Sequence, residues 1–309
     1  MTDETADEFL QMDSEHSPPD PPKFTADDWQ RSRESGDFCR MLFEWYKFVS
    51  MLCNFFASIR PDSPAVRPID RIHYSVLIGS LNRCARLMFS NVALSHEGLF
   101  GETTAIIDRC IFESCVKVCW LCQNASSGAF ARFLADGLKT ELELRDRIEK
   151  AVASRNGQVL AIERRMLASI ARYIDSSGMN AADIEATKKL PDLAAMIDSL
   201  GHERLTYVVG QRLGSHHIHG TWPSLRMHYL QESADGLLAL RDHDCSTHVN
   251  QYVFIPLFVL DAMEQFVRFI FHAHEDVTAM VALVESVRHE LGKINSEVVG
   301  SDFEKVEEV

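Results

Sequence analysis

The chain has 309 residues, of which 46% are hydrophobic, so it can bury a sizeable core in one large or two modest domains and is not a disordered protein. Its formal net charge is −14, but residues 1–37 carry 11 acidic and 3 basic side chains, and residues 296–309 carry 5 and 1. The body between them is nearly neutral, with 29 acidic and 27 basic side chains, so the total charge does not exclude a local basic pocket.

Residues 1–35 are predicted to form a disordered acidic tail. Prolines fall at positions 18, 19, 21 and 22, apolar residues are few, and no basic stretch followed by an apolar run resembles a signal peptide. Eight cysteines without a signal peptide indicate reduced thiols in a cytoplasmic protein. The longest apolar run, residues 252–260, is too short to cross a bilayer, so we expect no membrane span.

Residues 36–295 are predicted to form a single all-α domain, a helical bundle. Apolar residues recur at spacings of three and four, and convincing alternation at two is absent. A second disordered acidic tail is expected at residues 296–309. The expected helices span residues 36–60, 67–96, 100–124, 128–154, 158–176, 191–200, 203–214, 226–241, 247–274 and 276–295.

The segment from about residue 128 to residue 187 differs in character from the rest of the bundle. It is rich in Glu, Arg, Lys and Ala, and its apolar positions form a narrower stripe. Such a pattern is typical of a helical hairpin that buries only one face. We therefore expect this segment to project from the bundle rather than to form a separate domain.

Cysteines at positions 115, 119 and 122 match the C-x3-C-x2-C spacing with which radical enzymes bind an iron–sulfur cluster. Here, however, the three cysteines lie at i, i+4 and i+7 of one predicted helix, which also carries Cys110. Packed buried thiols behave as small apolar side chains. The pattern therefore favours a structural role, and we expect no cofactor.

The same helix carries Arg109, Glu113 and Lys117, each one turn after the last. On a surface helix these side chains would form a solvated ion-pair ladder worth a few tenths of a kcal/mol per pair. This helix is apolar on most other sides, so the Arg–Glu pair could instead point into a bundle cavity, where burial requires partners. The residues alone leave both interpretations open.

Residues 211–222, QRLGSHHIHGTW, combine three histidines with Arg212 and Ser215 at the predicted end of a helix. Histidine titrates near neutrality, so such a cluster suits proton transfer, phosphate contact or metal ligation, although capping of the helix end is the simpler role. His217 and His219 could chelate a metal, but no carboxylate or cysteine nearby in the sequence completes a site. We therefore expect no metal. The His-Asp dipeptide at residues 243–244 and the histidines at 272 and 274 are weaker candidates.

Two short motifs carry a family resemblance. Ile107-x-Arg109-x3-Glu113 lies in one apolar helix, and Tyr207-x7-Ser215-x3-His219-Gly220 follows about a hundred residues later. Their order and spacing resemble those of the domain-of-unknown-function 5677 family of helical, mostly bacterial proteins, over roughly residues 67–275. The resemblance implies that the Arg, Glu, Tyr, Ser and His of these motifs, at positions 109, 113, 207, 215 and 219, converge in one bundle pocket, with Arg109 and Tyr207 contacting a ligand.

Arg212-x4-His217 and Arg212-x6-His219 also resemble the Arg-x4–6-His motif of HEPN helical ribonucleases, although Gly214 is expected to interrupt the helix and Leu213 replaces the usual polar residue. The resemblance implies a metal-independent ribonuclease or a toxin or phage-defence effector that acts as a homodimer. His217 or His219 would deprotonate a 2′-hydroxyl of RNA and Arg212 would stabilise the phosphorane, with Ser215 and Glu113 in the same pocket.

Two other interpretations stay open. The first is a non-catalytic helical protein whose Arg–Glu–His network recognises a small anionic or nucleotide ligand. The second is a purely architectural network, a buried polar cluster that fixes the packing of the bundle.

Overall fold

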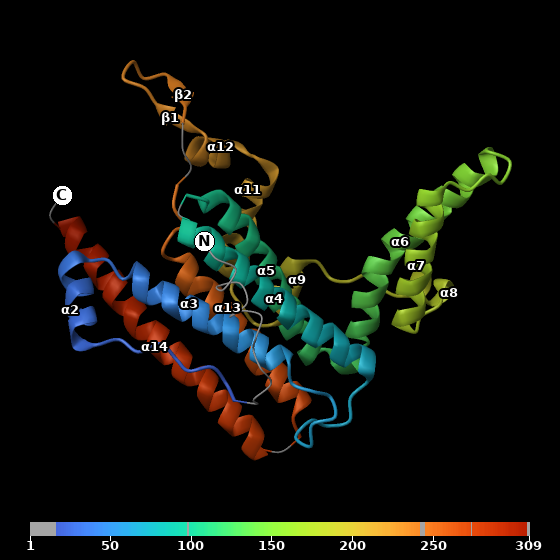
Figure 1. Ribbon diagram of the computed structural model, residues 1–309, viewed down its shortest axis with the longest axis horizontal. Coiled ribbons are helices and arrows are strands. Elements are labelled where there is room, and N and C mark those ends of the chain that lie inside the picture. The colour runs from blue at the N-terminus through green and yellow to red at the C-terminus, as the bar shows by residue number, and fades with distance from the viewer. Residues whose placement is uncertain (1–16, 98, 242–244, 273, 308–309) are drawn as a thin grey trace, which may run out of the picture.

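The computed structural model describes residues 17–307 except residues 98, 242–244 and 273 (Figure 1). The predicted all-α fold is confirmed, because the described residues form helices apart from loops and one two-stranded hairpin. Within these residues, no helix combines the length and the apolar composition needed to cross a bilayer.

The bundle is built from α3 (Cys39–Ala57), α4 (Arg71–Glu97), α5 (Gly101–Gln123) and α13 (Gln251–Ile270), which pack on one another (Figure 1). The run that was too short for a membrane becomes the start of α13, a helix buried along most of its length. Helix α14 (His274–Glu307) packs against α13 and α3. Burial of these apolar faces is the main force that holds the bundle together.

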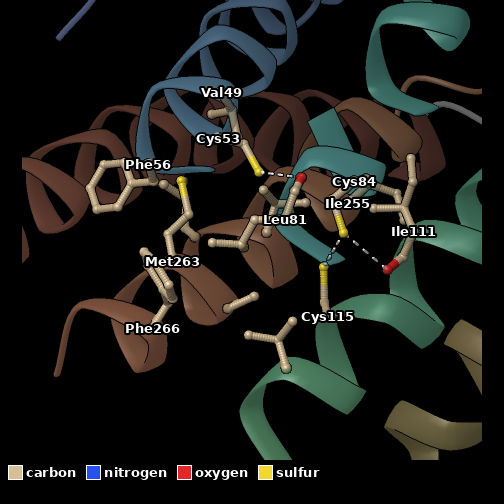
Figure 2. Packing of buried hydrophobic residues seen from close by; sticks show 14 of the residues in the cluster. Val49, Cys53, Phe56, Leu81, Cys84, Ile111, Cys115, Ile255, Met263 and Phe266 are labelled. Atoms are coloured by element: carbon tan, nitrogen blue, oxygen red, sulfur yellow. Dashed lines mark hydrogen bonds between the residues drawn. The ribbon is translucent and has the colours of Figure 1, made fainter. Parts of the chain in front are cut away.

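Cys115 and Cys119 of α5 pack in the bundle core, as their helical spacing predicted. Cys84 Sγ lies 3.8 Å from Cys115 Sγ, and Cys53 Sγ donates a hydrogen bond of 3.3 Å to the Leu81 carbonyl (Figure 2). Burial raises the pKa of the Cys53, Cys115 and Cys119 thiols well above the usual value. These thiols are therefore protonated and serve as small apolar side chains.

The predicted hairpin is formed by α6 (Ala129–Ser154) and α7 (Ala161–Ser177), which extend away from the bundle (Figure 1). A short helix, α8 (Ala181–Ala186), packs back against α6. Together they enclose a small apolar cluster of their own around Leu142 and Ile184. Gly178 ends α7 with a φ of 70°, in the left-handed region that favours glycine.

Both predicted tails contain helix in the structure, which corrects the expectation of disorder there. Residues 26–35 form α2 (Ala26–Ser35), because Thr25 and Asp28 make a reciprocal capping box at its start. At the other end, α14 continues to Glu307 instead of stopping at residue 295. Residues 1–16, 308 and 309 lie outside the described part of the chain.

The helix predicted at residues 226–241 is wrong. The chain instead forms α12 (Trp222–His228), then β1 (Leu230–Glu232) and β2 (Leu238–Leu240), which pair antiparallel with Leu230 opposite Leu240. The turn between the strands closes through Gly236, whose φ is 77°. Strands of three residues are too short to show alternation in the sequence.

The remaining helices lead into the histidine run. After η1 (Ala125–Ser127) and the hairpin come α9 (Leu193–Ser199), α10 (Arg204–Tyr207), a π-helical segment η2 (Val208–Leu213) and α11 (Gly214–His219). Gly214 has φ −61° and ψ −24°, so it continues the helix that it was expected to interrupt. The helix ends at Gly220, in the left-handed conformation.

Candidate functional site

The candidate site lies where η2 and α11 cross α5. Gly210 and Gly214 are one turn apart on the crossing face, and a Cβ on Gly214 would lie 2.9 Å from Arg109 Cβ. At Gly210 an added Cβ would overlap the ring of Phe112. The two glycines therefore let the backbones approach closely, beside a π-helical segment of a kind often found at functional sites.

A cavity of about 460 Å³, here called the Arg109 cavity, opens beside this crossing. Its wall combines apolar side chains with a small number of polar groups, which is the usual composition of a small-molecule site. The wall is formed by Ala105, Asp108, Arg109, Val209, Gly210, Leu213, Gly214, His217, Asn250, Gln251, Val253, Phe254, Ile255, Leu257, Asn295 and Val299.

Asp108 is the buried acid of this cavity, with 6% of its surface exposed. Asn91 Nδ2 donates a hydrogen bond of 2.6 Å to Asp108 Oδ1, which also lies 3.5 Å from the Tyr46 hydroxyl. Its other oxygen, Oδ2, is buried and has no hydrogen-bond partner within the described part of the chain. Burial raises the pKa of Asp108 well above its usual value, so the carboxyl group favours its neutral form.

Arg109, the next residue of α5, supplies the cation. Its Nε is buried and, among the described residues, makes no hydrogen bond. Glu113, the expected partner of Arg109, instead accepts a hydrogen bond of 2.7 Å from Lys117, and both of these side chains are partly exposed. Glu113 and Lys117 therefore form the solvated ion pair expected on a surface helix, whereas Arg109 lines the cavity.

A second group of polar side chains lies near the N-terminus of α5. One ligand atom each from Glu102, His217 and His228 lies within 4.8 Å of the other two, and we call these three residues the His–Glu cluster. The Glu102 carboxylate accepts hydrogen bonds from the hydroxyls of Ser224 and Tyr229. The cluster thus joins α5, α11 and α12.

The loop before α13 closes over this cluster. The Gly101 amide donates a hydrogen bond of 2.7 Å to the Cys245 carbonyl, and a Cβ on Gly101 would lie 2.7 Å from the same oxygen. Cys245 Sγ lies 3.2 Å from His228 Nδ1. A cavity of about 520 Å³ adjoins the cluster and is lined by both histidines and by Cys245. His217 lines this cavity and the Arg109 cavity.

The structure brings together two of the residues predicted for the site, Arg109 and His217, on the wall of one cavity. Arg212 and His219 are exposed and line neither of the two cavities. The arrangement therefore differs from both motif-based expectations, since His217 is recessed while His219 ends the helix in solvent.

The other predicted residues make local contacts. Ser215 donates a hydrogen bond of 2.7 Å to the Gln211 carbonyl, one turn back along the helix. Tyr207 packs under the guanidinium of Arg204, whose Cζ is 4.7 Å from the ring centroid. Neither residue lines the two cavities, so the pocket implied by the resemblance is not formed by all five of its residues.

Sequence reasoning missed Glu102, Asp108, His228 and Cys245. Asp108 could have been noticed as an acid in an apolar helix, next to Arg109. The other three are separated by long stretches of sequence, and no spacing rule connects them. Residues 242–244, with their His-Asp dipeptide, lie outside the described residues. His272 is exposed, and its Nε2 lies 3.0 Å from the Pro64 carbonyl oxygen.

Comparison with known proteins gives one result that bears on identity. The model of the family described as "Family of unknown function (DUF5677)" matches residues 74–237, more than half of the chain. This range contains α5, the hairpin of α6 and α7, and the histidine run on α11. No curated protein and no solved structure gives a significant match. The chain therefore belongs to the DUF5677 family, as its Arg–Glu and Tyr–Ser–His motifs had indicated.

Proposed function

We propose that this protein binds a small organic anion, such as a nucleotide, in the Arg109 cavity and does not catalyse a reaction on it. The observation that carries the proposal is the buried Nε of Arg109, which has no hydrogen-bond partner among the described residues. A buried donor left without a partner costs roughly 1–3 kcal/mol. An anionic ligand that accepts this hydrogen bond would recover that free energy.

The neighbouring acid does not oppose an anion. Because burial raises the pKa of Asp108 well above its usual value, its carboxyl group favours the neutral form, and it then does not offset the charge of Arg109. A neutral carboxyl group can also donate a hydrogen bond. The Oδ2 atom, buried without a partner in the described residues, is the oxygen that is available to do so.

The rest of the wall suits an organic ligand rather than a bare ion. Its volume of about 460 Å³ falls within the range of roughly 300–1,000 Å³ that is common for small-molecule sites. Phe254 offers an aromatic face, and Asn250, Gln251 and Asn295 offer amides that can donate and accept hydrogen bonds. A nucleoside monophosphate combines the anionic, aromatic and polar groups that this wall can contact.

Calorimetric titration with AMP and with inorganic phosphate, both in the presence of a chelator, tests the proposal. We expect AMP to bind and to raise the melting temperature, since a ligand at a hundred times its Kd stabilises by about 2.7 kcal/mol. Arg109→Ala should abolish binding, and Arg212→Ala, which removes an exposed arginine from η2, is the matched control. If no anion binds to the wild type, the proposal fails, and if Arg109→Ala in addition only unfolds the protein, the network is architectural.

The ribonuclease hypothesis stays a prediction. One observation favours it: Arg212 and His219 are both exposed on the continuous helix from α10 to α11, where an RNA chain could reach them. Labelled RNA incubated with the protein in chelator should then be cleaved, and cleavage should be lost in Arg212→Ala or His219→Ala. RNA that stays intact at every protein concentration would exclude this function.

The homodimer expected for such an enzyme also stays a prediction. Large apolar side chains are exposed around the histidine run and the β-hairpin, among them Leu213, Trp222, Met227 and Leu240. Contiguous exposed apolar surface often marks a protein interface. Light scattering should give the mass of a dimer, and Trp222→Glu should return the protein to a monomer.

A further inference from the structure

The His–Glu cluster has the side chains and the spacing of a metal site. Two imidazoles and one carboxylate, from Glu102, His217 and His228, place one ligand atom each within 4.8 Å of the others. Bonds from zinc to nitrogen or oxygen ligands are roughly 2.0–2.2 Å long, so small side-chain rotations would bring all three ligand atoms to one ion. This cluster does not involve the Arg109 guanidinium or its neighbour Asp108.

Burial distinguishes this cluster from a chance group of surface residues. Glu102 is 8% exposed and His228 is 4% exposed, and they come from different helices. Carboxylates are rarely fully buried unless they are paired with a cation or bind a metal. Among the described residues, the neutral hydroxyls of Ser224 and Tyr229 donate hydrogen bonds to Glu102, and neither hydroxyl supplies a positive charge.

Groups around the cluster hold its members in position. The hydroxyls of Ser224 and Tyr229 orient the Glu102 carboxylate, and the Cys245 sulfur lies 3.2 Å from His228 Nδ1. Metal-binding histidines usually use one ring nitrogen for the metal and the other for such an orienting contact. His228 would therefore bind the metal through Nε2.

The backbone beneath the cluster is also fixed. The Gly101 amide bonds to the Cys245 carbonyl, and the hydroxyls of Thr104 and Thr247 lie 3.0 Å apart. These contacts tie the first turn of α5 to the loop before α13, so that Glu102 and Cys245 keep their relative positions. Because these groups are already positioned, metal binding costs less conformational entropy.

We propose that Glu102, His217 and His228 form a binding site for a divalent transition-metal ion of the zinc type. Imidazole nitrogens favour zinc, iron or cobalt over magnesium and calcium, which prefer oxygen ligands. Three protein ligands are typical of zinc sites that keep one exchangeable position. Both histidines line the second cavity, so that position would be accessible from there.

The tertiary structure supplies the ligands whose absence near His217 in the sequence led us to expect no metal. The neighbours of His217 along the chain provide no carboxylate or cysteine, but α5 supplies Glu102 and α12 supplies His228. His219, which the sequence pairs with His217 as a possible chelator, is exposed at the helix end. The proposed site therefore uses one histidine of the run and leaves the other two outside it.

Calorimetric titration of the chelator-treated full chain with Zn²⁺, Co²⁺ and Mg²⁺ tests the site. We expect one equivalent of Zn²⁺ or Co²⁺ to bind and to raise the melting temperature, and we expect no effect of Mg²⁺. His228→Ala and Glu102→Gln should abolish binding. His216→Ala and His219→Ala, which remove histidines from the same helix, are the matched controls and should bind as the wild type does.

A milder variant covers the case in which Glu102→Gln or His228→Ala fails to fold. Tyr229→Phe removes one orienting hydroxyl and should weaken Zn²⁺ binding by about 10–100-fold, the usual loss for such contacts. The proposal would be overturned if Tyr229→Phe bound Zn²⁺ with unchanged affinity and Zn²⁺ binding depended on His219. It would also be overturned if the wild type bound no Zn²⁺. Arg109→Ala should retain Zn²⁺ binding, so the anion proposal and the metal proposal can be tested independently of each other.

Discussion

Gly214 of α11 and Arg109 of α5 pack so closely that a methyl group on Gly214 would lie 2.9 Å from the Arg109 Cβ. The glycine thereby fixes how deeply α11 sits against α5. It also leaves room for the arginine side chain to run along the cavity wall. Two residues that are about a hundred positions apart in the sequence thus define one edge of the candidate site.

Gly214→Ala should destabilise the protein by about 1–3 kcal/mol, because the added methyl group overpacks the crossing of the two helices. Gly79→Ala is the matched control, since Gly79 lies in α4 and a Cβ there meets nothing within 4 Å. That control should be neutral or stabilising by up to about 1 kcal/mol, because alanine is the better helix former. Urea unfolding measures both changes, and equal effects of the two substitutions would contradict the close packing.

Asp108→Asn should change how stability depends on pH. Burial raises the pKa of Asp108 in the folded protein above its unfolded value of 3.8. The stability that the neutral carboxyl group contributes is therefore fully present below that pH and is lost as the pH rises through the folded-state pKa. Asparagine cannot ionise. The free energy of unfolding of the wild type should therefore fall, relative to that of the variant, as the pH rises.

Urea unfolding of both proteins at several pH values between about 4 and about 8 checks this difference. Asp136→Asn, at an exposed position on α6, controls for the general effect of replacing an aspartate. The free energies of unfolding of the wild type and Asp108→Asn could instead differ by the same amount at every pH. That result would show that Asp108 ionises as easily in the folded as in the unfolded protein.

Cys115 and Cys119 should resist thiol reagents in the native protein. Both are buried, and burial raises their pKa, so the reactive thiolate is scarce and the sulfur is inaccessible. Mass spectrometry after brief alkylation should find these two unlabelled, whereas all eight cysteines should react once the chain is unfolded. Rapid native labelling of Cys115 would contradict the core packing seen in Figure 2.

Arg288→Met should destabilise the packing of α14 on α13 by roughly 1–3 kcal/mol, because it leaves carboxylates without their charged partner. Arg288 lies 2.6 Å from Asp261 and from Glu264, and its own side chain is only 20% exposed. Arg33→Met breaks a contact of the same length, to Glu297, but at a more exposed position. Thermal unfolding should show a clearly smaller loss for Arg33→Met, since solvent screens exposed pairs.

Most helices could be predicted from the sequence because each has an apolar face with its own period, which is a local property. The spacing of apolar residues fixed α3, α4, α5 and α13. Local signals also placed the projecting hairpin. The β-hairpin at residues 230–240 was not predicted because three-residue strands carry too little pattern. Helix α2 was not predicted because it depends on a capping box and not on an apolar repeat.

The sequence by itself determined the all-α class, the family and the candidate residues Arg109 and His217, because motifs within one helix follow from spacing. Only the tertiary structure decided which histidine turns inward. The η2 segment and α11 pack against α5 through Gly210 and Gly214, so half-buried His217 lines the two cavities and His219 is exposed at the helix end. It also placed Glu102 and His228 beside His217, since contacts between distant segments depend on how helices pack and not on any local periodicity.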